Sequence, residues 1–315
     1  MTIPVFYAIS DDYTKYAAVS LNSLVKHASS QRDYTVYFLS QDLSDRHMQD
    51  LRQLGSPNVH IEFFTINDDL VTTIQNRSEN YLRGDFFTMS IFFRLFIPNL
   101  FPQYDKAIYL DSDTIINDDL GKLYDTHLGS QLLAACSDSS IQYVNKMLIY
   151  IKAVLGLDPK QYINSGVLLL NCQALRNEGF INHFTTLLEK YHFDCIAPDQ
   201  DYLNEICDQR ILHLDPKWDA MPNDHTVPST SPSIIHYNLF FKPWHFTGVQ
   251  YEQYFWDSAK ETHFYQELKT ELADYTDKQR AVDRHKLDQM LAKEDKIVND
   301  PLNWAQVKKQ GTVSL

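Results

Sequence analysis

Short apolar runs alternate with segments of helical periodicity through the first two-thirds of this chain of 315 residues. The run Val5–Ile9 precedes residues 13–27, in which apolar side chains recur on one helical face. Ser44 stands where it can cap a further helix that continues to Leu54. The expected strands are Val5–Ile9, Val36–Leu39, Val59–Phe64, Ala107–Leu110, Leu132–Ala135, Val167–Leu170 and Ser233–His236. Because continuous apolar strands alternate with helices, the chain predicts an α/β fold with a mainly parallel sheet covered on both faces.

The chain is acidic, with a formal net charge of −13. Residues 260–315 hold ten Lys or Arg and ten Asp or Glu, so the whole excess lies in residues 1–259. Such a surface repels a phosphate backbone, and nucleic acid is therefore not an expected partner. An acidic body that binds a smaller anion needs a divalent cation to offset the charge.

Cysteine usage and hydropathy predict a cytoplasmic protein. No C-x-x-C spacing occurs, and the thiols lie in or beside apolar segments, as buried, reduced cysteines do. They are Cys136, Cys172, Cys195 and Cys207. The N-terminus lacks the basic region and apolar stretch of a secretion signal. The apolar run Ile91–Phe93 is broken by Arg94, and no run approaches the roughly 18 apolar residues that a membrane span requires.

The composition changes beyond Trp256. Residues 260–298 are polar, contain no Gly or Pro, and carry apolar residues at roughly helical spacing. We expect a main domain over residues 1–258 and a C-terminal helical segment over residues 259–315. The zero net charge of residues 260–315 weakens a peripheral contact with membrane, which needs clustered cations. Structural packing or self-association into a homo-oligomer is the favoured role.

The triplet Asp111-Ser112-Asp113 directly follows the expected strand Ala107–Leu110. Residues two apart on an extended backbone share a face, so the two carboxylates can close on one divalent cation. Carboxylate oxygens suit Mg²⁺ or Mn²⁺, which often bridge protein and substrate phosphates. The triplet alone is weak evidence, because a second Asp-x-Asp occurs at Asp199-Gln200-Asp201.

Other polar residues follow the expected strands in the same way. Ligands of such sheets collect beyond the carboxyl ends of the strands. The candidates there are Ser10, Asp11, Asp12, Asp111, Asp113, Asp138 and His236. We therefore expect residues spread over most of the chain to meet on one rim.

Six stretches together resemble the family 8 glycosyltransferases, a retaining group with the GT-A fold. They are Val5–Ala8 leading into Asp11–Tyr13, Phe93–Leu95, Tyr109–Asp113, Tyr162–Asn171, Asp199–Asn204, and His236–Tyr237 with Lys242–His245. The resemblance covers residues 3 to 247 and leaves the C-terminal segment outside. It implies a GT-A, Rossmann-like sheet flanked by helices, and a nucleotide-sugar donor.

The resemblance implies a metal site made by Asp111, Asp113 and His236, to which the donor diphosphate adds oxygens. A neutral imidazole accepts Mn²⁺ readily and Mg²⁺ poorly, so Mn²⁺ is favoured. By itself His236 is more simply a buried core histidine, but the following Lys242-Pro243-Trp244 favours the metal role. Ser112 belongs to the same diphosphate-binding triplet.

The donor nucleotide is expected near the first strand. Asp12 and Tyr13 resemble the stretch that holds uracil and ribose, with Ala8 supplying backbone contacts, and Ser10 stands where the family commonly carries an acid. Lys242 places a positive charge suited to a phosphate oxygen. The family pattern has a glycine where this chain has Leu239, and Leu is poorly tolerated at positive φ.

The donor sugar is expected among short polar side chains. Asn164, Asp199 and Gln200 would line its pocket, and Asp138 would hold a hydroxyl group. Asp199 can equally serve as a helix cap after Pro198. Arg94 lies among apolar residues, so it either pairs with a structural acid or reaches the donor; the resemblance favours the donor.

These expectations describe transfer of a hexose from UDP-galactose, favoured over UDP-glucose, to a saccharide or glycosylated protein. The candidates for catalysis are Gln200, Asp199 and Asp138, but Gln200, which takes the family's position for a nucleophile, is an amide. Attack by the acceptor on the same face of the sugar is therefore favoured. A nucleotidyltransferase would show an N-terminal Gly-rich loop, and no Gly precedes Gly55. The other alternative is a catalytically inert sugar-nucleotide or partner-binding protein on the same fold.

Overall fold

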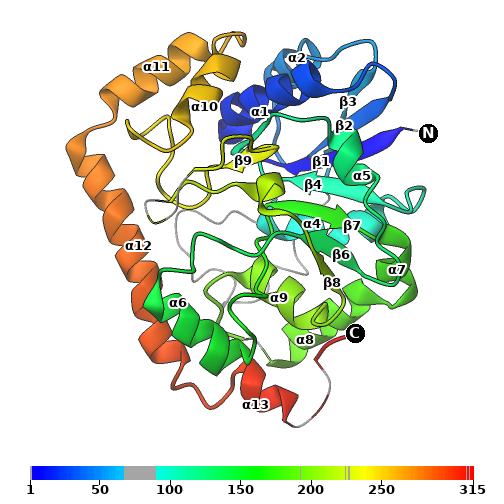
Figure 1. Ribbon diagram of the computed structural model, residues 1–315, viewed down its shortest axis with the longest axis vertical. Helices are drawn as coiled ribbons and strands as arrows, with labels where there is room; N and C mark the ends of the chain where they lie inside the picture. Colours follow the sequence, from blue (N-terminus) through cyan, green and yellow to red (C-terminus); the bar gives the residue numbers. More distant parts are fainter. Residues whose placement is uncertain are drawn as a thin grey trace.

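A seven-stranded sheet forms the centre of the molecule (Figure 1). The computed structural model describes residues 2–66, 90–191, 193–223, 225, 228–309, 311 and 313–315. The strand order is β3-β2-β1-β4-β7-β6-β8. The strands are β1 (Ile3–Ala8), β2 (Tyr34–Ser40), β3 (Val59–Thr65), β4 (Ala107–Leu110), β6 (Leu133–Ala135), β7 (Val167–Leu170) and β8 (Ile211–His213). Only β7 runs antiparallel to its neighbours β4 and β6, which confirms a mainly parallel sheet.

One expected strand lies elsewhere. Ile234–His236 forms β9, which pairs antiparallel with β5 (Thr114–Ile116) in a separate two-stranded sheet. The prediction that residues 233–236 complete the main sheet is therefore wrong. Three-residue strands carry too little periodicity to show which sheet they join, and β5 and β8 were missed for the same reason.

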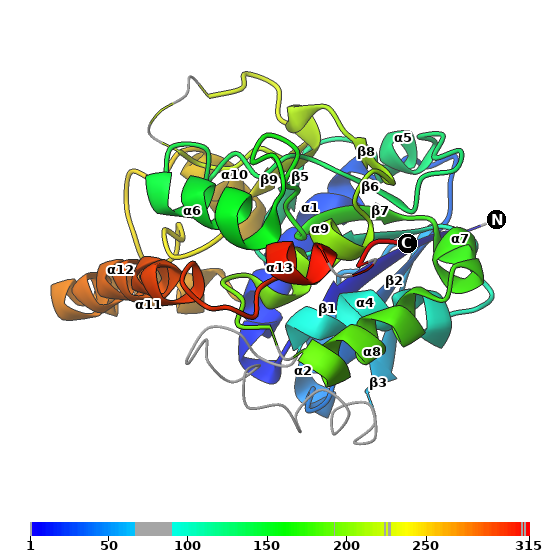
Figure 2. The same cartoon turned by 90° about the horizontal axis from the view of Figure 1, so that it is seen from below.

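Both faces of the sheet are covered because successive side chains point to opposite sides. Val5 and Tyr7 of β1 belong to one buried cluster, and Phe6 between them belongs to another. Helices α1 (Thr14–His27), α2 (Asp45–Arg52) and α10 (Glu252–Ala259) pack on the first cluster. Helices α4 (Ser90–Leu100), α8 (Phe180–Tyr191) and α9 (Pro198–Ile206) pack on the second, and Figure 2 shows α4 and α8 together below the sheet.

The remaining helices are short or C-terminal. The short ones are α5 (Leu120–Tyr124), α6 (Asn145–Tyr150), α7 (Cys172–Asn177) and the single turns η1 (Asp11–Tyr13), η3 (Ile151–Leu155) and η4 (Pro216–Asp219).

Ser44 caps α2 as predicted, because its hydroxyl oxygen accepts the His47 N–H.

The C-terminal segment is helical, as expected from its periodicity. It forms α11 (Tyr265–Asp274), α12 (Asp277–Ile297) and α13 (Trp304–Lys308). In Figure 1 these helices run down one edge of the molecule, and α12 contacts α6. Among the described residues, no helix combines the length and apolar character that a membrane crossing requires.

Candidate active site

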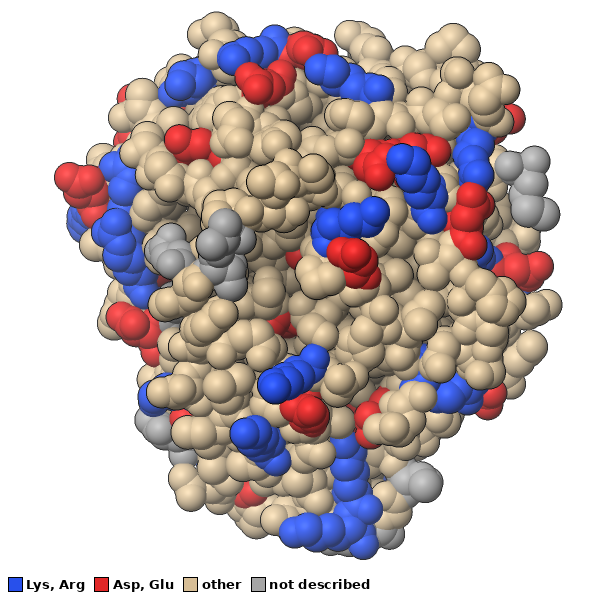
Figure 3. Space-filling view, viewed as in Figure 1, with Lys and Arg blue, Asp and Glu red and all other residues tan. Residues whose placement is uncertain are grey.

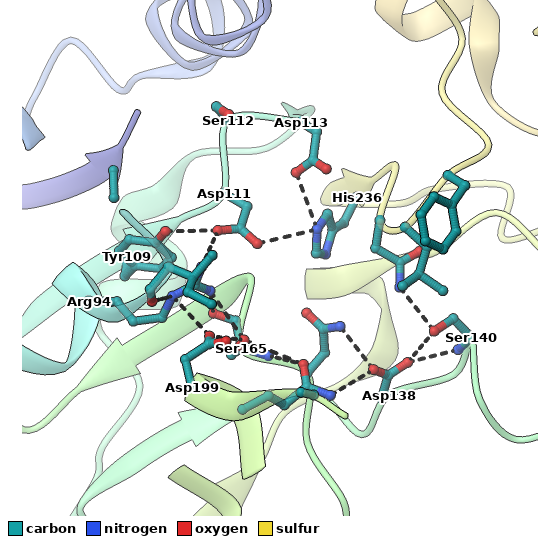
Figure 4. A pocket seen from close by; sticks show the side chains of 18 of the residues that line it. Arg94, Tyr109, Asp111, Ser112, Asp113, Asp138, Ser140, Ser165, Asp199 and His236 are labelled. Carbon is teal, nitrogen blue, oxygen red and sulfur yellow. Dashed lines mark hydrogen bonds and ion pairs between the residues drawn. The ribbon is translucent and has the colours of Figure 1, made fainter. Parts of the chain in front are cut away.

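A cavity of about 200 Å³ opens where β1 and β4 end (Figure 4). Every residue predicted for the site except Asp11 and Asp12 lines it. They are Ala8, Ser10, Tyr13, Arg94, Asp111, Ser112, Asp113, Asp138, Asn164, Asp199, Gln200, His236, Leu239 and Lys242. Asp11 and Asp12 line an adjoining cavity of about 410 Å³, which shares Tyr13, Leu239 and Lys242 with the first.

The small sheet brings His236 to the two aspartates. The chain leaves β4 at Leu110, turns through the Asp-Ser-Asp triplet and enters β5, where Thr114 pairs with His236. The Tyr237 N–H also donates to the Asp113 carbonyl at 3.0 Å. Two backbone pairings therefore hold residues more than a hundred positions apart side by side.

The ligand atoms of Asp111, Asp113 and His236 all lie within 4.8 Å of one another. His236 Nε2 is 3.3 Å from Asp113 Oδ1 and 3.7 Å from Asp111 Oδ2. The Asp113 Oδ1 atom is buried and accepts no hydrogen bond from the described residues. Two carboxylates and an imidazole at this spacing fit a divalent cation.

The charges of this group are strongly coupled. Burial by itself would raise the pKa of Asp113, but Lys242 and His236 outweigh it and hold that pKa well below its usual range. Burial would likewise lower the pKa of His236, but the carboxylates of Asp113 and Asp219 raise it well above its usual value. Lys242 Nζ also donates to the carbonyl oxygen of Tyr237. The positive charges of Lys242 and His236 thus stabilise the ionised form of Asp113.

Asp219 was missed by the sequence reasoning. It ends η4, is fully buried, and places Oδ1 3.1 Å from His236 Nδ1. Burial raises the pKa of Asp219 to about 6, an effect that His236 partly offsets. No local pattern in the chain links an acid after Trp218 to a histidine in a later strand.

Gly166, in the stretch Tyr162–Asn171, lies beside His236 and Asp111. A Cβ atom at this position would lie 2.2 Å from His236 Cε1 and 2.8 Å from Asp111 Oδ2. Neither distance is sterically allowed, so the absence of a side chain lets both ligand-bearing residues approach. The Asp111 N–H donates to the Gly166 carbonyl at 2.7 Å.

Arg94 pairs with acids inside the cavity wall. Its Nη2 lies 2.9 Å from Asp111 Oδ1 and its Nε 3.3 Å from Asp199 Oδ2. Nη1 donates to the Ser165 carbonyl at 2.6 Å, and the guanidinium lies over the Tyr109 ring. Burial would lower the pKa of Arg94, but the neighbouring carboxylates raise it and keep the group charged. The acids that pair with Arg94 are themselves residues of the cavity, and Arg94 lines the cavity with them.

Asp138 holds the amides of the opposite wall. Its Oδ2 accepts from Asn164 Nδ2 at 3.0 Å and from Gln200 Nε2 at 3.1 Å. Its Oδ1 accepts from the backbone N–H and the hydroxyl of Ser140. Gln200 Oε1 accepts from the Ser165 N–H at 3.0 Å. These bonds fix which end of each amide faces which way.

Leu239 adopts a φ of 60°. This left-handed conformation favours glycine, the residue of the family pattern, although Leu occupies it here. Two residues upstream the chain is held by the Tyr237 N–H, and three residues downstream by Lys242, which pairs with Asp113. Packing of both flanks maintains a conformation that Leu disfavours by itself.

Known proteins resemble this chain in sequence. The lipopolysaccharide 1,2-glucosyltransferase of Escherichia coli K12 is 24% identical over 76% of this chain and 72% of its own length. GlyB of Streptococcus pneumoniae is 27% identical over 66% of this chain and 57% of its own. The chain also spans 66% of the length of a Haemophilus influenzae relative.

Two solved structures share the fold. The galactosyltransferase LgtC, in complex with donor and acceptor analogues, superimposes with a TM-score of 0.69 at 21% identity, covering 86% of this chain and all of LgtC. The bifunctional glycosyltransferase WbbM has a TM-score of 0.72 at 24% identity, covering 87% of this chain and 52% of WbbM. The family model described as "Glycosyl transferase family 8" matches residues 4–248. The chain belongs to glycosyl transferase family 8.

Proposed function

We propose that this protein transfers a hexose from a UDP-sugar, UDP-galactose before UDP-glucose, to a saccharide or glycosylated protein. The observation that carries the proposal is the convergence of Asp111, Asp113 and His236 within 4.8 Å in a cavity that also contains Lys242. The same set would stabilise a departing diphosphate, which favours an enzyme over an inert binding protein. The site of the reaction is expected to be the cytoplasm, where thiols such as the four free, buried cysteines stay reduced.

Asp111, Asp113 and His236 would hold Mn²⁺. When bound, such an ion offsets the charge that develops on a departing diphosphate. Lys242 supports the same end of the cavity with a second positive charge. Its ammonium group lies against Asp113 and can turn towards a phosphate oxygen, because a Lys side chain is flexible and its charge compact.

The sugar end of the cavity is prepared by hydrogen bonds. The Asp138 carboxylate orients the amides of Asn164 and Gln200, so neither has to be ordered when a hexose binds. Arg94 forms ion pairs with Asp199 and Asp111 and so orients both carboxylates. The result is a set of donors and acceptors of defined direction, which is what discrimination between hexoses requires.

The hydrogen bonds also bear on how the anomeric configuration is retained. A double displacement needs a free nucleophile, but the Gln200 Oε1 atom already accepts from the Ser165 N–H. Asp199 Oδ2 accepts the Ser165 hydroxyl at 2.9 Å and pairs with Arg94. Asp138 accepts four donors. These contacts favour attack by the acceptor hydroxyl on the same face of the sugar, with the leaving phosphate taking its proton.

A panel of UDP-sugars with Mn²⁺ tests the proposal. UDP release is expected to be fastest with UDP-galactose, to stop on chelation, and to be lost in Asp113→Asn, while Asp105→Asn, which changes an exposed carboxylate, keeps it. Simple saccharides added with the best donor should accelerate UDP release, and NMR of the product should show the donor's anomeric configuration.

No turnover with any UDP-sugar would support the inert alternative. A covalent sugar trapped on Gln200 or Asp199 would overturn same-face attack.

A further inference from the structure

Asp219 occupies an unusual position for a carboxylate. Its side chain is fully buried, and Oδ2 accepts no hydrogen bond from the described residues. The Oδ1 atom lies 3.1 Å from His236 Nδ1. Burying a carboxylate is costly unless a partner compensates, so the contact with the imidazole is the main compensation that the described residues offer.

The contact decides which nitrogen of His236 faces the cavity. A ring that donates its Nδ1–H to Asp219 presents Nε2 on its other side. Nε2 is the atom that lies 3.3 Å from Asp113 and 3.7 Å from Asp111. The His236 ring therefore lies between the carboxylate of Asp219, next to Nδ1, and the carboxylates of Asp111 and Asp113, next to Nε2.

The backbone around Asp219 is tied to the strand of His236. The Ala220 N–H donates to the Ile234 carbonyl at 2.9 Å, and the His236 N–H donates to the Ala220 carbonyl at 3.0 Å. Gly166 leaves the space in which the ring lies. The backbone bonds thus hold Asp219 at a fixed place relative to His236. A residue that orients a metal-binding histidine needs such a fixed position.

We propose that Asp219 is a positioning residue that fixes the orientation and the Nδ1–H form of His236, so that Nε2 binds the metal. This inference rests on the metal site of the proposed function. Partners of this kind behind a ligating histidine typically change metal affinity by about 10- to 100-fold. Asp219 itself does not line the cavity and would touch neither metal nor substrate.

The test is a titration of the purified full chain with Mn²⁺ alone, with free Mn²⁺ measured by electron paramagnetic resonance. Asp219→Ala should weaken binding by about 10- to 100-fold. Asp219→Asn, which keeps the size and one acceptor oxygen, should weaken it less and provides a variant that folds if Asp219→Ala does not. Asp215→Ala is the matched control, because Asp215 caps the same short turn without touching His236.

A double variant separates positioning from a general structural effect. If Asp219 acts through the imidazole, Asp219→Ala adds no further loss of Mn²⁺ affinity in a His236→Ala background. An equal additional loss in that background, or wild-type affinity in both Asp219 variants, would overturn the inference alone. Absence of Mn²⁺ binding by the wild-type protein would instead overturn the proposed metal site, and this inference with it.

Discussion

Leu239 departs from the glycine of the family pattern, yet its backbone adopts a conformation that favours glycine. A left-handed conformation costs an L-residue about 1–2 kcal/mol relative to glycine. The loop keeps it because the neighbouring Tyr237 and Lys242 are both anchored at Asp113. Strain of this kind beside a candidate site is compensated by the contacts of the flanking residues.

Comparing Leu239→Gly with Leu239→Ala measures this strain, because the two variants differ only in the Cβ methyl group. The Gly variant should be more stable than the Ala variant by about 1 kcal/mol, because only Ala retains the penalty of φ at 60°. Urea unfolding gives the difference. A Gly variant less stable than the Ala variant would show that the loop does not hold this conformation in solution.

Gly166→Ala tests the close approach beneath His236. A Cβ atom 2.2 Å from Cε1 must displace the ring, so Mn²⁺ affinity and Mn²⁺-dependent UDP release should both fall at least tenfold, about the loss expected for a misplaced ligand. Gly121→Ala is the control, because the atoms nearest to its Cβ belong to the side chains of Arg32, at 2.7 Å, and Asp119, at 2.8 Å, and to neither metal-site residue. Unchanged Mn²⁺ affinity in Gly166→Ala would mean that the ring is free to move.

At the scale of single elements, helix α9 is buried on all sides although it is rich in polar residues. Several of these polar side chains have hydrogen-bond partners in neighbouring elements. Asp201 accepts from the hydroxyls of Tyr150 at 2.7 Å and Tyr162 at 2.5 Å, and Asn204 bonds both the N–H and the carbonyl of Ile163. The start of the helix, which carries Asp199 and Gln200, is therefore held by hydrogen bonds as well as by packing.

Tyr162→Phe removes one of these bonds and leaves a buried carboxylate oxygen of Asp201 without that donor. The free energy of unfolding should fall by about 1–3 kcal/mol. Tyr143→Phe, in which the ring is half exposed, should change it little. Denaturant unfolding of the two variants checks the prediction, and equal stability would mean that water replaces the lost hydroxyl.

The elements also show where prediction from sequence succeeds and where it stops. Runs such as Val5–Ile9 and Val167–Leu170 are fully apolar, so local pattern identified them as buried strands. The pairing of β5 with β9 depends on contacts between distant segments, which local pattern does not contain. For that reason His236 was placed at the correct end of its strand but in the wrong sheet, and its partner Asp219 was not found.

At the scale of the whole molecule, the C-terminal segment contacts the body along its length, and two of these junctions lie near its opposite ends. On α11, Glu271 Oε1 accepts the Tyr16 hydroxyl at 2.5 Å and lies 3.1 Å from His245 Nε2, close to the loop of Lys242. On α12, Met290 lines the candidate active-site cavity. In Figure 3, basic and acidic side chains alternate along the edge formed by α11 and α12, as expected for a surface rich in ion pairs. We propose that residues 259–315 help to shape the site that residues 1–258 carry.

The second junction lies at the other end of the segment. The Trp304 ring stacks on Phe193 at 3.8 Å, and Lys308 Nζ pairs with Glu205 of α9 at 2.6 Å. Burial raises the pKa of Glu205 to about 8, and Lys308 offsets only part of that rise. A protonated Glu205 therefore favours the folded state.

This pair predicts how stability depends on pH. Because the folded pKa of Glu205 lies above its ordinary value of 4.5, its contribution is fully present below about pH 4.5 and is lost as the pH rises to about 8. Between about pH 5 and about pH 8, the melting temperature of Glu205→Gln should therefore fall less than that of the wild-type protein. Glu178→Gln, an exposed control, should follow the wild type. Parallel curves for all three proteins would contradict a protonated Glu205.

The central claim is that Asp111, Asp113 and His236 together hold a metal against the diphosphate of a UDP-sugar. Crystals grown with Mn²⁺ and UDP test it most directly through anomalous diffraction at the manganese edge. The account predicts one strong peak within ligand distance of both carboxylates and of His236 Nε2, with UDP phosphate oxygens completing the coordination. UDP bound in the cavity without a peak there, or a manganese peak elsewhere in the molecule, would contradict it.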